Sequence, residues 1–289
     1  VSGVFEIEIP KKAEKEISFV CSFEENIDQI NVKKLIENEI VRQNEIYNKS
    51  LLIDNRKEKK TKKQLEEEQL IKDFITATDN FVVYRPSFRL HTLLAGYPWF
   101  LDWGRDSLIS FEGLLLVTKR FDIAKEVLQT LVRDIKFGLV PNGYSGFDNR
   151  PLYNSVDASL LLFEQIQKYV EYTEDYEFVK ENLYEKLKDI IENYKNGIDV
   201  DDNNIYLDTD YLIVSGTQNT QNTWMDAKCN NKAVTPRNGK AVEINSLWYN
   251  ANVIMADLEN KIGNKNDAKK YQELARKCKK AFNEKFYNK

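Results

Sequence analysis

The stretch Ala95–Ser110, AGYPWFLDWGRDSLIS, decides how this chain is interpreted, because it sets aromatic rings beside carboxylates and an arginine. Trp103 stands next to Arg105 and Asp106, where the segment turns into an apolar, helix-like run. An aromatic face covers the C–H side of a sugar ring and charged groups hold its hydroxyls, so the combination favours a sugar pocket. The alternative is a loop capped onto a helix, with Trp103 in the core and Arg105 and Asp106 as a local ion pair.

The composition predicts a globular chain with a substantial core and no nucleic-acid or membrane partner. Its 289 residues are 42% hydrophobic and 12% aromatic. The net charge of −4 argues against nucleic-acid binding, which needs a basic face. No apolar run reaches transmembrane length, and no secretory signal opens the chain. The sequence begins at Val1 rather than at methionine, so we expect a fragment whose partner is the remainder of a parent polypeptide.

The cysteines indicate the cellular compartment, and the single histidine limits the kinds of catalytic or metal site that the chain can form. Cys21, Cys229 and Cys278 are far apart and odd in number, which is typical of a reducing compartment and predicts a cytoplasmic location. His91 is the only histidine, so a histidine-built zinc site is excluded and a Ser-His-Asp triad would need His91 as its base. We interpret His91 as structural and expect chemistry based on carboxylates, with no metal and no cofactor.

Hydrophobic periodicity divides the chain into three parts. Residues 1–30 alternate in VFEIEIP and EISFVCSF, which predicts two short strands at the tail of an upstream β-domain. Residues 31–80 are expected to form a linker helix and a charged segment that leads into the third part. Residues 81–289 are expected to be helical and to form a barrel or toroid whose long polar loops gather at one end.

Helical spacing of apolar residues defines the individual helices. Thr173 is the expected N-cap of the helix that begins at Tyr176. Two strand-like pieces, IYLD and YLIV, lie in the polar stretch between residues 200 and 222. One helix is predicted to end near residue 78. The other predicted helices cover residues 32–52, 106–118, 122–137, 156–172, 176–196, 242–261 and 266–286.

Four junctions between a loop and a helix share one character. They are AGYPWFLDWGRD, NRPLYNSVD (149–157), TWMDAK (223–228) and NGKAVEINSLWYN (238–250). Each places carboxylates or amides next to Tyr or Trp where a helix begins, and helix N-termini add free N–H donors. If the helices form a barrel, these junctions can converge on one carbohydrate pocket.

The motifs AGYPWFLDWGRDSLIS, YNSVDASLLLF, TWMDAK and GKAVEINSLWYNA resemble the glucosidase domain of glycogen debranching enzymes, the amylo-α-1,6-glucosidase family. The resemblance runs from about Phe81 to the end of the chain, with the motifs in the family's order. It implies a mostly α fold, an incomplete (α/α)6 barrel (α/α toroid), preceded by two short β-strands from an upstream β-sandwich. It also implies hydrolysis of α-1,6 branch points in glycogen or branched oligosaccharides with inversion.

The resemblance assigns roles to residues of three junctions. Asp226 in TWMDA resembles the general acid, and we expect it to be buried beside Trp224 so that it keeps its proton near neutral pH. Arg105 and Asp106 resemble the pair that grips the terminal glucose, with Trp103 as the wall of that subsite. For Asp226, the structural alternative is an ordinary helix N-cap.

Further residues are expected in supporting roles. Glu243 is a second candidate carboxylate, or alternatively a first-turn acid favoured by the helix dipole. Trp224 and Trp248 are candidate sugar platforms, although either could belong to the core. The remaining candidates for substrate contact are Lys240, Tyr153 and Asp157, of which the last two could instead be structural.

The general base is expected to lie outside this sequence. By resemblance it follows the last helix of this chain, and the predicted helices are fewer than a complete (α/α)6 barrel needs. An inverting glycosidase places its base about 6.5–9.5 Å from its acid to activate water on the opposite face of the sugar. We therefore expect the 289-residue chain to be inactive or poorly active alone, unless Glu243 is the base.

Three other interpretations remain open at this stage. One is a different (α/α)6 hydrolase, glucoamylase-like or trehalase-like, with another linkage preference. The second is a non-catalytic glucan-binding module, which would use the same aromatics but tolerate Asp226→Asn. The third is a helical scaffold without a ligand.

Overall fold

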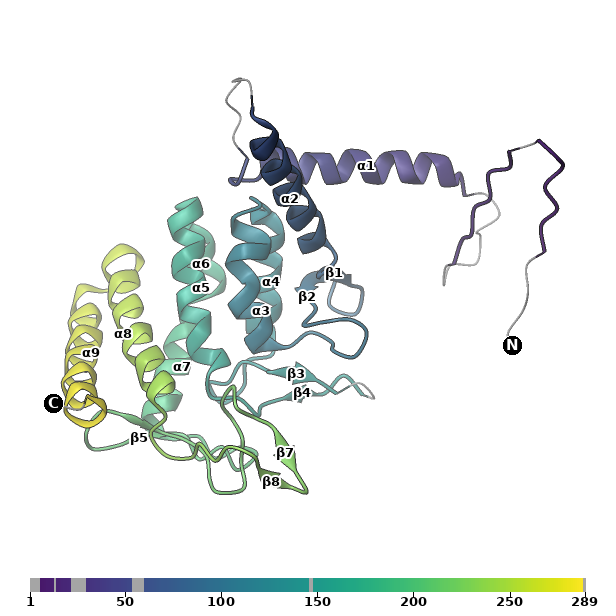
Figure 1. Ribbon diagram of the computed structural model, residues 1–289. Helices are drawn as coiled ribbons and strands as arrows, with labels where there is room; N and C mark the ends of the chain where they lie inside the picture. The colour runs from purple at the N-terminus through teal and green to yellow at the C-terminus, as the bar shows by residue number, and fades with distance from the viewer. Residues whose placement is uncertain (1–5, 13, 22–29, 54–59, 146–147, 288–289) are drawn as a thin grey trace.

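The computed structural model describes residues 6–12, 14–21, 30–53, 60–145 and 148–287, and most of the ordered elements are helices. Figure 1 shows the helices from α3 onward standing side by side, with the long loops and short hairpins gathered at one end. The predicted helical body with its loops at one end is therefore confirmed, whereas closure into an (α/α)6 arrangement stays a prediction. No helix in the described part of the chain is long and apolar enough to cross a membrane.

The helices agree with the periodicity of the sequence, most of them to within a few residues. They are α1 (Val32–Lys49), α2 (Lys62–Asp79), α3 (Gly104–Phe111), α4 (Phe121–Arg133), α5 (Ala158–Thr173), α6 (Tyr176–Asn182), α7 (Tyr184–Asn196), α8 (Val242–Ile262) and α9 (Lys265–Phe286). A π-helical turn, Glu112–Leu116, continues α3.

The strands form four small antiparallel hairpins rather than one sheet. They are β1 (Val82–Arg85) with β2 (Leu90–Leu93), β3 (Gly143–Tyr144) with β4 (Pro151–Leu152), β5 (Tyr206–Leu207) with β6 (Ile213–Val214), and β7 (Lys228–Cys229) with β8 (Lys232–Ala233). The two strand-like pieces predicted between residues 200 and 222 correspond to β5 and β6.

The core is built by helices that each turn one apolar stripe inward. On α4, Ala124, Val127, Leu128 and Leu131 follow the spacing that places side chains on one face, and all are buried. On α9, the small and aromatic residues Ala268, Tyr271, Ala275, Cys278 and Ala281 form the corresponding stripe. Helix α3 packs on α5, α5 on α8 and α8 on α9, so the core runs continuously from one helix to the next.

Side-chain caps fix where several helices begin. Asn31 accepts from the backbone N–H of Lys34, and Thr61 forms a capping box with Gln64. The cap of α6 is Asp175, whose carboxylate accepts from Phe178 N at 3.1 Å. The prediction that Thr173 caps this helix is wrong, because Thr173 is the last residue of α5 and its hydroxyl donates to Tyr169 O.

Two further predictions of secondary structure need correction. The single helix expected over 176–196 is divided at Leu183, whose side chain is fully buried and whose backbone leaves the helical region. The two strands expected within residues 1–30 do not form in the described residues 6–12 and 14–21, and the rest of that segment lies outside the described residues. A strand is stable only when it pairs with further strands, and no strand is assigned in these two described segments.

Helix α1 projects from the helical body (Figure 1). It buries no residue, and its apolar side chains Leu35, Ile36, Ile40 and Val41 are each more than half exposed. Its C-terminal end is attached where Leu51 N donates to Val117 O at 2.9 Å. The linker helix is therefore present, but it contributes little to the core.

Candidate functional site

The N-terminus of α3 is locked to the loop at Pro141 and Asn142. The backbone N–H of Gly104 donates to Asn142 O at 3.0 Å, and that of Arg105 donates to the Asn142 side-chain oxygen at 3.3 Å. A Cβ on residue 104 would lie 2.5 Å from Pro141 O. Glycine in the WGRD motif is therefore required by the close approach of these two backbones.

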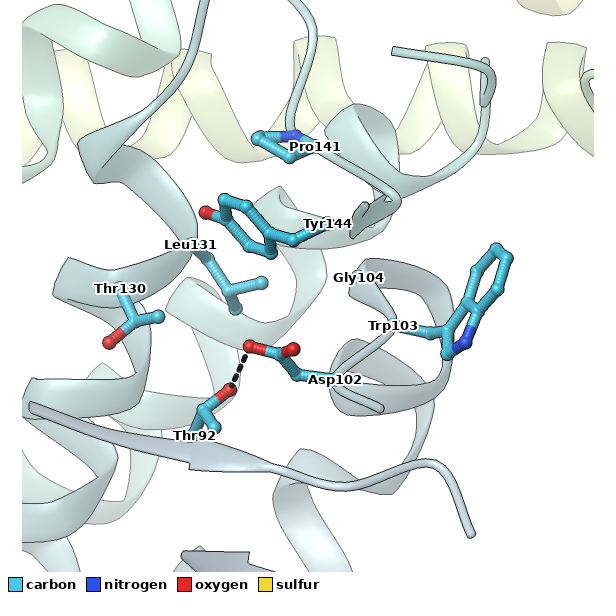
Figure 2. A pocket seen from close by; sticks show the side chains of 8 residues that line it. All are labelled: Thr92, Asp102, Trp103, Gly104, Thr130, Leu131, Pro141 and Tyr144. Carbon is cyan, nitrogen blue, oxygen red and sulfur yellow. Dashed lines mark hydrogen bonds between the residues drawn. The ribbon is translucent and has the colours of Figure 1, made fainter. Parts of the chain in front are cut away.

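Asp102 and Trp103 point to opposite sides of the chain as it enters α3 (Figure 2). Trp103 has an extended backbone, so successive side chains alternate. Asp102 is buried, pairs with Arg85 at 2.5 Å and accepts from Thr92 at 3.3 Å. The cavity drawn in Figure 2 has about 10 Å³, enough for one water molecule and too small for a sugar.

Arg105 holds two carboxylates that come from distant parts of the sequence. Its Nε donates to Asp157 Oδ2 at 2.7 Å and its Nη1 to Asp226 Oδ2 at 3.0 Å. The side chains of Arg105 and Asp157 are 10% and 5% exposed, whereas that of Asp226 is 45% exposed. Burial alone would lower the pKa of Arg105, but its bonds to Asp157 and Asp226 outweigh this and raise the pKa, so the guanidinium stays charged.

Asp157 is fixed by its own neighbours. Ser155 Oγ donates to Asp157 Oδ1 at 2.5 Å and also accepts from the backbone N–H of Ala158. Ser155 therefore caps the start of α5, while Asp157 makes no side-chain cap and faces Arg105 instead. Asp157 is thus a support for Arg105.

Asp106 lies next to this group with an exposed side chain. Partial desolvation raises the pKa of its carboxyl, Arg105 and the helix backbone oppose the rise, and the charges of Asp226 and Asp157 add to it. Arg105, Asp106, Asp157 and Asp226 thus form one electrostatic unit, which we call the carboxylate–arginine cluster.

A pocket of about 390 Å³ opens beside this cluster. Trp103 and Asp226 line it together with polar residues of three loops. Its floor is stabilised by two buried amides, since the Asn222 side chain donates to Asn203 O and Oδ1, both at 3.2 Å, and Asn203 donates to Tyr153 O. The remaining lining residues are Asn154, Asp201, Thr220, Gln221 and Lys228. Its size is that of a small-molecule site, and its lining is polar apart from Trp103.

Asp226 and Trp224 are more exposed than the sequence predicts. Trp224 is 56% exposed, and the Asp226 side chain is 45% exposed. The expected burial of Asp226 beside Trp224 is therefore not found, and its close partner is Arg105. Trp224 remains available as an aromatic face near the junction that carries Asp226.

Three of the expected substrate contacts are engaged elsewhere. Trp248 is fully buried and stacks on Tyr194, with ring centroids 6.1 Å apart, so it belongs to the core and offers no sugar platform. Lys240 donates to Asp208 and Asp210, at 2.6 and 2.7 Å. Tyr153 donates its hydroxyl to Asp134 O at 2.7 Å and does not line the pocket.

Glu243 is also paired. It accepts from Arg237, whose other terminal nitrogen lies 3.9 Å from Met225 Sδ. Arg237 thus lies between this carboxylate and Met225, the residue before Asp226. Glu243 does not line the pocket that Asp226 lines.

Sequence reasoning does not single out the amides that shape the site. Asn142, Asn203 and Asn222 are buried and bonded, and Gln221 is half-buried. Polar loops rich in Asn and Thr are common on surfaces, so composition alone does not identify buried members. The one available signal was the concentration of such residues between two helical regions.

Comparison with known proteins finds a matching family and related sequences. The sequence model of a family described as amylo-alpha-1,6-glucosidase matches residues 76–289. The chain is also 28% identical to a glycogen debranching enzyme of Saccharomyces cerevisiae, over an alignment that covers 61% of this chain and 15% of the relative. The chain thus spans a small part of that relative's length.

Proposed function

Because this chain belongs to the amylo-alpha-1,6-glucosidase family, we propose that it is part of a glycoside hydrolase that releases glucose from α-1,6 branch points of glycogen or related α-glucans. The observation that carries this proposal is the contact of Arg105 with both Asp157 and Asp226 at the edge of a polar pocket. That arrangement supports a site in which one carboxylate is accessible and held in place by a buried cation. We also propose that the helices belong to an (α/α)6 barrel, that an upstream β-domain precedes it, and that the protein is cytoplasmic.

In the proposed reaction, Asp226 donates a proton to the departing glycosidic oxygen. Its exposure supports this role, because the carboxyl must be reached by the substrate and reprotonated from solvent after each turnover. Arg105 and Asp106 hold hydroxyls of the terminal glucose, and Trp103 covers one face of its ring. The bond from Asp157 keeps Arg105 in place while it does so.

We propose that the general base comes from the remainder of the parent polypeptide. Inversion requires a second carboxylate that activates water on the far side of the sugar. Within this chain, Glu243 is held by Arg237 and Asp157 by Arg105, and neither lines the pocket beside Asp226. The residues described above then supply the acid and the glucose-binding side of the site.

The test compares the parent polypeptide with its Asp226→Asn variant on an α-1,6-branched dextrin. Loss of a general acid typically costs about 10²–10⁴-fold in rate, so kcat is expected to fall by that factor while dextrin binding is kept. Asp257→Asn, on an exposed position of α8, is the matched control and should leave kcat unchanged. Unaltered turnover by Asp226→Asn would refute the assignment, and a parent polypeptide that binds dextrin without cleaving it would favour a glucan-binding module.

The same preparation separates this proposal from the related hydrolases. Linear α-1,4-linked oligosaccharides and trehalose are offered beside the branched dextrin. A preference of kcat/KM for the branched substrate is expected. Preference for either of the other substrates would point to a glucoamylase-like or trehalase-like enzyme.

A further inference from the structure

We propose that Gln221, assisted by Asn154, is a specificity-determining residue that binds the sugar unit on the leaving-group side of Asp226. This inference rests on the proposed function, since it assumes that a glucan occupies the pocket. It assigns a role to residues that neither the fold nor the carboxylate–arginine cluster requires.

The side-chain amide of Gln221 has no hydrogen-bond partner in the described part of the chain, although its oxygen and nitrogen are both buried from water. Its neighbours in the same pocket behave differently, because the amides of Asn203 and Asn222 bond to each other and to the backbone. Buried amides are rarely left unpaired in native proteins, so an unpaired one points to a missing partner.

The pocket that Gln221 lines lies beside the proposed glucose grip, and Trp103 borders both. Trp103 and Asp226 belong to its lining, whereas Arg105 and Asp106 do not. A terminal glucose held by Arg105 and Asp106 would therefore leave this volume for the sugar unit that departs when the bond next to Asp226 breaks. The volume of about 390 Å³ is in the range of small-ligand sites.

The wall around Gln221 carries other polar side chains that the described structure leaves unengaged. Asn154, Asp201 and Lys228 line the pocket and are exposed, and none of the three side chains has a hydrogen bond or ion pair with another described residue. Elsewhere charged groups are closely paired, as Lys240 is with Asp208 and Asp210. Lys228 and Asp201 carry opposite charges and lie in the same pocket as the amides of Asn154 and Gln221. This lining favours a neutral ligand with many hydroxyls over a charged ligand.

The chemistry of an amide matches that of a sugar edge. Its NH₂ group donates and its oxygen accepts, and adjacent hydroxyls can do both. Gln221 as a whole is only half-buried, so rotation of its side chain turns the amide from its buried position toward the pocket. The expected ligand is an uncharged oligosaccharide of at least two sugar units.

The test measures binding of glucose and of an α-1,6-linked glucose disaccharide to this chain by NMR titration. In Gln221→Met, which keeps the side-chain volume but removes the hydrogen bonds, disaccharide affinity is expected to fall roughly 5- to 20-fold, as for loss of one or two buried hydrogen bonds. Glucose affinity should change less than about 2-fold, because glucose occupies the other side of Asp226. Gln129→Met, whose amide bonds Asn182 on another face, is the control.

The outcomes separate the role of Gln221 from the proposed function on which it rests. Equal losses for both sugars, or no loss for the disaccharide, would overturn the role of Gln221 while leaving the proposed function intact. If the unmodified chain binds neither sugar, the glucose-binding site proposed for this chain fails and the assignment of Gln221 fails with it, whereas cleavage of branched dextrin by the parent polypeptide tests the proposed function separately. Thermal unfolding of each variant shows whether a loss of affinity comes from loss of fold.

Discussion

The guanidinium of Arg105 lies 3.0 Å from the carboxylate of Asp226, although 121 positions separate the two residues in the sequence. Arg105 is buried and held from behind by Asp157, so the position of the contact is set by α3 and α5 rather than by the loop that carries Asp226. The half-exposed carboxylate is thus oriented from inside the protein while its outer side remains open to a substrate.

Removing Asp157 is expected to destabilise the fold more than its size suggests. Asp157→Ala leaves the buried Arg105 with Asp226 as its one remaining carboxylate contact, and breaking a buried pair typically costs about 3–5 kcal/mol. Urea unfolding measures the change. Asp148→Ala, which removes an exposed carboxylate that contacts Arg150, should cost much less. Equal effects of the two substitutions would show that the Arg105–Asp157 pair is not an important contact.

Two tryptophans that the sequence treats alike should behave oppositely. Trp248→Ala empties a fully buried site against Tyr194 and should cost about 3–5 kcal/mol of stability. Trp224→Ala removes an exposed ring, so stability should change by less than about 0.5 kcal/mol while glucan binding weakens. Stability is read from denaturant unfolding and binding from titration with a branched dextrin. A stability loss at Trp224 as large as at Trp248 would contradict the assignment.

The turn between α8 and α9 has no room for a side chain at residue 263 unless Glu259 and Tyr184 shift. A Cβ on Gly263 would overlap Glu259 Oε2 and Tyr184 Oη, so Gly263→Ala should destabilise the protein by about 1–3 kcal/mol. Gly113 is the matched control, because its added Cβ meets nothing within 4 Å and alanine favours a helical backbone. Gly113→Ala is expected to stabilise by up to about 1 kcal/mol, and the opposite order of the two melting temperatures would refute the packing described here.

Because two lysines bind Asp210, the free energy of unfolding should depend on pH in the acid range. Burial alone would raise the pKa of Asp210, but hydrogen bonds from Lys240 and Lys285 and from the Leu212 backbone outweigh it and bring the pKa to about 2. Because the folded pKa is below the ordinary value of 3.8, this contribution is complete above about pH 4 and is lost as the pH falls toward 2. The difference in unfolding free energy between the wild type and Asp210→Asn should therefore shrink over that interval. A constant difference would exclude the linkage.

Periodicity and capping residues predicted the helical body well, since each helix buries a stripe that is visible in one segment of sequence. The interruption at Leu183 could not be predicted in this way, because it depends on which neighbours bury that side chain. The strands predicted within residues 1–30 fail for a related reason. Alternation predicts a strand only where a partner strand exists.

The residues of the site that lie in long sequence motifs could be predicted. Arg105, Asp157 and Asp226 are brought together, as the junctions suggested. The prediction that TWMDAK begins a helix is wrong, because this segment leads into the hairpin of β7 and β8. Trp248 and Lys240 are not brought to the site, because an aromatic or a cation near a junction can equally face the core or a local carboxylate. Only the packing of α8 and the turn between β5 and β6 decides between those orientations.

The bond between Asn203 and Asn222 has a consequence for how this site can vary. The two side chains join the loops beneath the pocket together with a backbone bond from Gly216 N to Asn203 O. Residues 217–221, which follow that backbone bond and are not buried, can then be inserted or deleted at the rim while the anchor points remain. Such a scaffold can acquire a new substrate preference by altering loop length alone, without rebuilding the helices that carry Arg105 and Asp157.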